Sequence, residues 1–157
     1  MKGFALIEII VGVAIIAGAF LMLGNIAELT LRLVDVSTER LQAVFLLSEG
    51  IEAVRTIRDD GWTENIASLD ANTMYYLQFN TVNNEWATTT ITQILDGVFT
   101  RSFVLGEVER DAEDDIVSSN GTVDPDTRRI DMTVSWTNRS RSYEESISTY
   151  ITDLFNN

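Results

Sequence analysis

Cysteine and histidine are absent from this chain of 157 residues, and lysine and proline occur once each. Without cysteine there is neither a disulfide nor a thiol nucleophile, and without histidine there is no Ser-His-Asp triad. Most zinc sites also need one of these two residue types. No other set of residues has the pattern of a catalytic site, so we expect neither enzymatic activity nor a cofactor.

Positive charge is also scarce, with 11 Lys and Arg against 24 Asp and Glu and a formal net charge of −13. The only lysine is Lys2, and the arginines are scattered along the chain. Binding to nucleic acid needs clustered basic residues, so nucleic acid is not expected as the main ligand. Hydrophobic residues make up 45% of the chain, which is enough for a packed core, and the length suits one domain plus an appended segment.

A long apolar run occupies residues 4–23, with Glu8 as its only charge. About 20 apolar residues are enough for a helix to span a bilayer. Lys2 precedes the run, which places the N-terminus in the cytoplasm by the positive-inside tendency. The alternative is a secretory signal cleaved near Ala17-Gly18-Ala19, although such signals have shorter apolar stretches.

Glu8 is unusual because a carboxylate inside a membrane helix costs about 2.5–3.5 kcal/mol on insertion scales. One interpretation is that Glu8 lies near the membrane surface and reaches water at small cost. That interpretation does not explain why a glycine stands directly before Phe4, at a fixed distance from the acid. Residues 2–8, KGFALIE, therefore need an explanation as one motif.

This motif, followed by the apolar run, resembles the type III signal of type IV prepilins and pseudopilins. The resemblance implies that a membrane-embedded prepilin peptidase cleaves after Gly3 and methylates the new amine of Phe4. Glu8 is then the fifth residue of the mature chain, as in the family. The implied partners are other pilins or further copies in a helical filament, and the pilus assembly platform in the inner membrane.

The resemblance also gives Glu8 a partner, the Phe4 amine of a neighbouring subunit, which sets the axial register of the filament. A buried amine and a buried carboxylate are each costly alone and much less so when paired. Loss of one partner leaves an orphan charge, at about 3–5 kcal/mol if it is fully buried.

The helical pattern continues beyond the apolar run as far as Asp59-Asp60-Gly61. Its apolar stripe contains Val44, Leu47, Ile51 and Val54. We therefore expect a leader of residues 1–3, a membrane or filament-core helix over 4–25, its amphipathic continuation over 26–60, and a globular β-rich domain over 61–157.

Strand patterns fill most of the C-terminal part. They cover residues 74–79, 85–89, 98–110 with an interruption at Gly106, 130–136 and 142–151, with turns expected at Asn120-Gly121 and Asp124-Pro125. The fold class is therefore α+β, with a long N-terminal helix packed on an antiparallel sheet through the stripe, which is the layout of pilins.

The densest acidic cluster contains Asp111, Asp114 and Asp115. Closely spaced carboxylates suit calcium, and some pseudopilins bind calcium in C-terminal loops. The spacing matches no calcium-loop motif, so we interpret the cluster as a solvated loop between strands and assign no metal site.

The sequence thus favours a structural subunit, a major or minor pilin of a type IV pilus. It would lie in the inner membrane before assembly and in an extracellular or periplasmic filament afterwards. A pseudopilin of a type II secretion or DNA-uptake system is an open alternative with the same chemistry. An uncleaved, single-span anchored binding module is an alternative of another class.

Overall fold

The computed structural model describes the backbone of residues 2–155 and the side chains of residues 7–155. Helix α1 (Lys2–Asp60) is followed by a short π-helical turn η1 (Thr63–Ala67) and then by strands only. The chain divides into two compact units, Met1–Leu41 and Gln42–Asn157. We call the second one the head unit; it contains the last five turns of α1 as well as the whole sheet.

The predicted helix over residues 4–60 is confirmed, including its end. The Gly61 N–H donates to the Arg58 carbonyl at 3.2 Å, which closes the last turn. Glycines at positions 12, 18, 24 and 50 do not interrupt α1, because a glycine inside a helix costs only about 1 kcal/mol relative to alanine.

One of the four positions predicted for the buried stripe of α1 is wrong. Leu47, Ile51 and Val54 are at most 6% exposed, as expected, but Val44 is 47% exposed. Ala43 takes its place and is fully buried. Positions three and four residues before Leu47 both lie near its face, so spacing alone does not choose between them; the small side chain is the one against the sheet.

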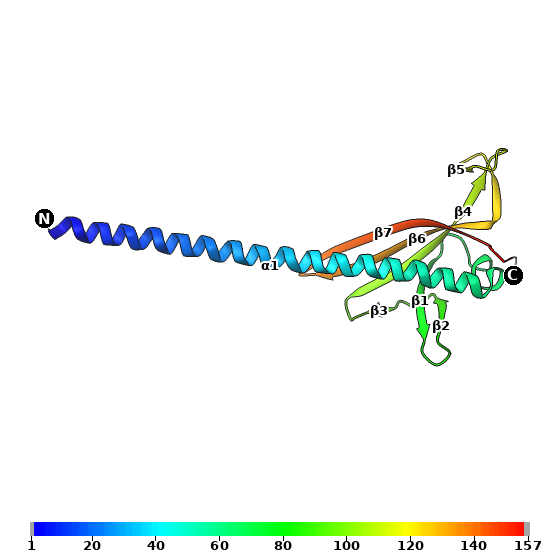
Figure 1. The fold of residues 1–157 in the computed structure, drawn as a ribbon, viewed down its shortest axis with the longest axis horizontal. Helices are drawn as coiled ribbons and strands as arrows, with labels where there is room; N and C mark the ends of the chain where they lie inside the picture. Colours follow the sequence, from blue (N-terminus) through cyan, green and yellow to red (C-terminus); the bar gives the residue numbers. More distant parts are fainter. Residues whose placement is uncertain (1, 156–157) are drawn as a thin grey trace. The chain divides into compact units, whose positions relative to one another are not determined.

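The sheet is antiparallel, with the strand order β2-β1-β4-β6-β7 and with the short strands β3 and β5 each paired to β4 (Figure 1). The strands are β1 (Met74–Asn80), β2 (Glu85–Thr89), β3 (Ile94–Leu95), β4 (Phe99–Arg110), β5 (Ile116–Val117), β6 (Thr122–Asn138) and β7 (Arg141–Thr152). All five predicted strands are present, and the α+β fold with its long N-terminal helix is confirmed, consistent with the pilin-like layout.

Two details of the strand prediction are wrong. β4 is continuous through Gly106, and its pairing with β6 shifts one residue later, between Glu107 and Val108. Asp124-Pro125 is not a turn but lies inside β6, where residues 125–127 have no partner in β4. Proline cannot donate a ladder hydrogen bond, so a bulge of this kind is where a strand tolerates it.

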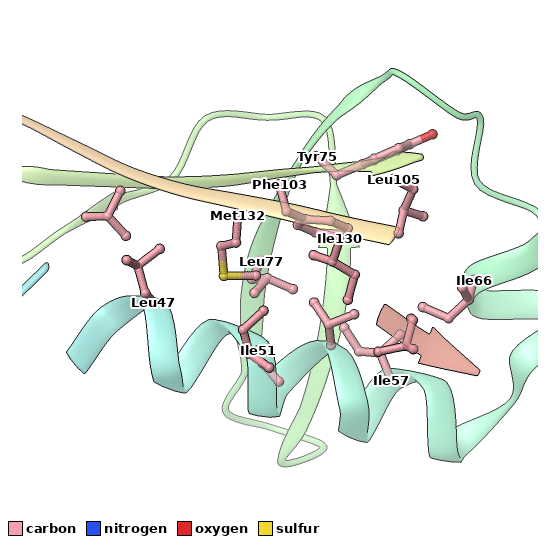
Figure 2. Packing of buried hydrophobic residues seen from close by; sticks show 14 of the residues in the cluster. Leu47, Ile51, Ile57, Ile66, Tyr75, Leu77, Phe103, Leu105, Ile130 and Met132 are labelled. Atoms are coloured by element: carbon pink, nitrogen blue, oxygen red, sulfur yellow. The ribbon is translucent and has the colours of Figure 1, made fainter. Parts of the chain in front are cut away.

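The core of the head unit lies between α1 and one face of the sheet. Figure 2 shows Leu47, Ile51 and Ile57 of α1 pointing toward Phe103 of β4 and toward Ile130 and Met132 of β6. The alternation predicted for residues 130–136 is confirmed, since Ile130, Met132, Val134 and Trp136 are all at most 3% exposed. Ring pairs complete the packing: Tyr75 with Phe103, Phe99 with Trp136, and Trp136 with Tyr143.

Candidate assembly site

Glu8 lies in the first turns of α1, on an exposed position of the helix. Its neighbours Ile7 and Ile9 are 61% and 67% exposed. No side chain among residues 7–155 forms an ion pair with Glu8. Gly3 and Phe4, the predicted cleavage and methylation site, fall among the residues whose side chains the structure does not describe.

Residues 9–27 contain no charged side chain; we call them the uncharged segment. At 1.5 Å per residue the segment is about 28 Å long, close to the thickness of a bilayer's hydrocarbon core. Its large side chains are exposed all around the helix: Ile10 59%, Ile15 68%, Phe20 70% and Met22 69%. No described part of the chain buries the most apolar part of α1. The helix is also long and apolar enough to anchor the protein in a membrane.

Charge returns directly after the uncharged segment. Glu28 and Arg32 form an ion pair one turn apart, and both side chains are more than half exposed. Such pairs stabilise a helix modestly and suit a water-facing surface. Glu8 and Glu28 thus mark the two ends of the uncharged segment.

The acidic cluster forms the hairpin loop between β4 and β5, and this loop is held by hydrogen bonds of its own. The Asp111 carboxylate accepts from the backbone N–H groups of Glu113 and Asp115 at 3.1 and 2.9 Å. Arg110 donates to the carbonyl of Asp114 at 2.9 Å. Within the described part of the chain, no three acidic side chains are grouped as metal ligands. The structure therefore places Asp111, Asp114 and Asp115 in a solvated loop and does not bring them together as a cation site.

Arg110 also fastens this loop to β6. Its Nε donates to the Asp124 carboxylate at 2.7 Å, and Nη2 donates to the Thr127 hydroxyl at 3.4 Å. The hydrogen bond from Arg110 lowers the pKa of Asp124, although partial burial acts in the opposite direction. The pair stabilises the bulge of β6 around Pro125, which is a structural role.

Arg101 is the polar residue that sequence reasoning missed. It lies on β4 between the buried rings of Phe99 and Phe103, and it is 2% exposed. Burial lowers the pKa of Arg101, and the nearby Glu49 opposes that effect. The signal was present in the sequence, because Phe99, Arg101 and Phe103 alternate and so share the core-facing side of their strand.

Comparisons of the chain with protein-family models, with curated protein sequences and with solved structures find no match. The site is therefore interpreted from its own residues: an acid at the start of an exposed, uncharged helical segment, joined to a separately packed β-rich head unit.

Proposed function

We propose that this protein is a structural subunit of a type IV pilus or of a related short pseudopilus. The observation that supports the proposal most strongly is the uncharged segment, which exposes large apolar side chains on every side. Glu8 lies directly before this segment and is the only charged residue of the apolar run at residues 4–23. Water does not solvate such a surface favourably, because burying apolar area is worth about 25 cal/mol per Å². Lipid covers it before assembly, and the helices of neighbouring subunits cover it in the filament.

In this mechanism the prepilin peptidase cleaves after Gly3 and methylates Phe4. The cationic amine of Phe4 and the carboxylate of Glu8 then pair between neighbouring subunits in the apolar filament core. The apolar side chains supply most of the attraction without fixing its register, because one isoleucine packs much like another. The charge pair fixes the register, since any displaced arrangement leaves two unpaired charges in a medium of low dielectric constant.

The protein would lie in the inner membrane with its N-terminus in the cytoplasm, and would then enter an extracellular or periplasmic filament through the assembly platform. The acidic head units would form the outer surface. Both the major and minor pilin roles and the pseudopilin role use this chemistry.

The test is incorporation of Glu8→Ala into filaments, with Glu28→Ala as the matched control. Glu28 is also an acid on an exposed face of α1, but it pairs with Arg32 of its own helix. We expect Glu8→Ala to insert into the membrane normally and to enter sheared filaments poorly or slowly, whereas Glu28→Ala enters at the wild-type level. Normal incorporation of Glu8→Ala would show that Glu8 is only a residue at the membrane surface.

A further inference from the structure

Of the glycines at positions 12, 18, 24 and 50 of α1, Gly50 alone has close neighbours from the sheet. A Cβ at this position would overlap the sulfur of Met132 and would lie 2.8 Å from Cδ of Arg101. By contrast, a Cβ at Gly12, Gly18 or Gly24 would meet nothing within 4 Å. Gly50 therefore opens a notch in the helix surface, which two sheet side chains fill.

Arg101 reaches through this notch to the helix backbone. Its Nη1 donates to the Leu46 carbonyl at 2.9 Å and lies 3.6 Å from the Glu49 carboxylate. The Leu46 carbonyl is the one that accepts from the N–H of Gly50 inside the helix, four residues later. Helical side chains point toward the N-terminus, so a side chain at position 50 would cover that carbonyl.

The buried guanidinium is only partly satisfied by these contacts. Nε and Nη2 are buried without a hydrogen-bond partner, while the ring of Trp86 lies 5.5 Å away. A buried cation with incomplete pairing stabilises a fold less than an apolar side chain of similar volume does. Arg101 is therefore a poor choice for stability alone.

The spacing of the apolar stripe does not by itself fix the axial position of α1 on the sheet. The buried stripe of Ala43, Leu47, Ile51, Val54 and Ile57 repeats every three or four residues. Sliding the helix by one repeat would replace each apolar side chain by the next one. The connection of residues 61–73 between α1 and β1 contributes Trp62 and Ile66 to the same core, so a shifted helix would have to carry these two side chains with it.

We propose that Gly50, Arg101 and Met132 form a register key that allows α1 only one axial position on the sheet. A displaced helix would bring a residue with a side chain opposite Arg101 and Met132, and the guanidinium would lose both the Leu46 carbonyl and Glu49. Arg101 thus acts as a positioning residue: it selects one register at some expense of stability. The key acts within a single chain and does not depend on filament assembly.

The test measures the register directly in the full chain in detergent micelles. Because the chain has no cysteine, spin labels attach only to introduced ones, at Thr56→Cys on α1 and Thr137→Cys on β6, both exposed. Wild type should give one interspin distance. Arg101→Met should give a second population displaced by about 5–6 Å, one helical repeat, with a melting temperature equal to or above that of wild type.

Two further variants distinguish register selection from simple packing. Leu105→Met changes another fully buried residue of β4 and should keep the single distance. Arg101→Lys retains a cation that can donate to the Leu46 carbonyl and should restore most of the single population. A single unchanged interspin distance in Arg101→Met would overturn the proposal, because Arg101 would then be dispensable for the register. Loss of cooperative unfolding in Arg101→Met would also overturn it, because Arg101 would then be required for stability.

Discussion

Two stretches of helix α1 are similarly rich in isoleucine, leucine and valine but have opposite environments. In the uncharged segment the apolar side chains surround the helix, and Ile15, Phe20 and Leu23 are each more than 60% exposed. In residues 43–57 most apolar side chains form one stripe that the sheet covers, although Val44 and Phe45 lie off it and are 47% and 65% exposed, and Glu49 and Glu52 face water. The distribution of polar residues around the helix, rather than its apolar content, decides whether its own chain can bury it.

The two stretches of α1 should therefore respond differently to substitution. The head unit supplies its own core, so its stability should respond to substitutions in that core. The uncharged segment has no cover from the described part of the chain, so its substitutions should act on insertion and assembly instead.

The largest effect should come from removing a ring in the head unit. Phe103 is 1% exposed and packs on Tyr75 with ring centroids 5.9 Å apart. Phe103→Ala should lower the free energy of unfolding by about 3–5 kcal/mol, measured by urea denaturation in detergent. Phe20→Ala, at a ring that is 70% exposed, should leave head unfolding unchanged; an equal loss in both variants would contradict the separation.

The converse substitution introduces a charge into the uncharged segment. Ile16→Arg should raise the free energy of membrane insertion by about 3 kcal/mol and reduce the carbonate-resistant membrane fraction. Ser48→Arg, on an exposed position of the head unit, is the control and should insert like wild type. If Ile16→Arg inserts as well as this control, residues 9–27 do not lie in hydrocarbon.

A smaller effect is expected at the ion pair between Arg110 and Asp124. Because Arg110 lowers the pKa of Asp124, the carboxylate stabilises the folded head unit above about pH 4, and this stabilisation is lost as the pH falls through the lowered pKa. Asp124→Asn should therefore lower the urea midpoint near pH 6. The difference from wild type should shrink toward about pH 2, and a constant difference would exclude the ionised form as its cause.

The smallest effect is expected at the surface of the head unit's helix. Glu52 and Arg55 form an exposed pair at 2.6 Å, one turn apart. Glu52→Gln should change the free energy of unfolding by no more than about 0.5 kcal/mol. A change comparable with that of Phe103→Ala would show that this face of α1 is covered by a partner.

Sequence patterns are sufficient for the long helix, for the five longer strands and for the buried face of β6, but they do not reveal the two-residue strands β3 and β5. Hydrophobic alternation identified residues 130–136, and the Asp-Asp-Gly sequence at residues 59–61 identified the end of α1. Spacing did not distinguish Ala43 from Val44, because the choice depends on the room available against the sheet. The Asp124-Pro125 sequence predicts a turn, because the bulge that accommodates Pro125 within β6 depends on the pairing of two strands and is not visible in either strand alone.

The candidate assembly site, too, could be predicted from the sequence only in part. Glu8 stands out in the sequence because a charge is conspicuous in an apolar run, and its role in assembly stays a prediction. The alternation of Arg101 with Phe99 and Phe103 indicates the core-facing side of the strand, but it does not indicate which group the buried arginine contacts. Its contact with Leu46 joins residues 55 positions apart, which no local pattern reveals.

The most direct measurement of the central claim is the intact mass of the protein from cells with an active prepilin peptidase. The proposed function predicts loss of residues 1–3 and the addition of one methyl group, with Phe4 as the first residue. A Gly3 variant that blocks cleavage serves as the reference for the uncleaved mass. A chain that retains residues 1–3 in those cells would contradict the account and would favour an uncleaved membrane-anchored protein.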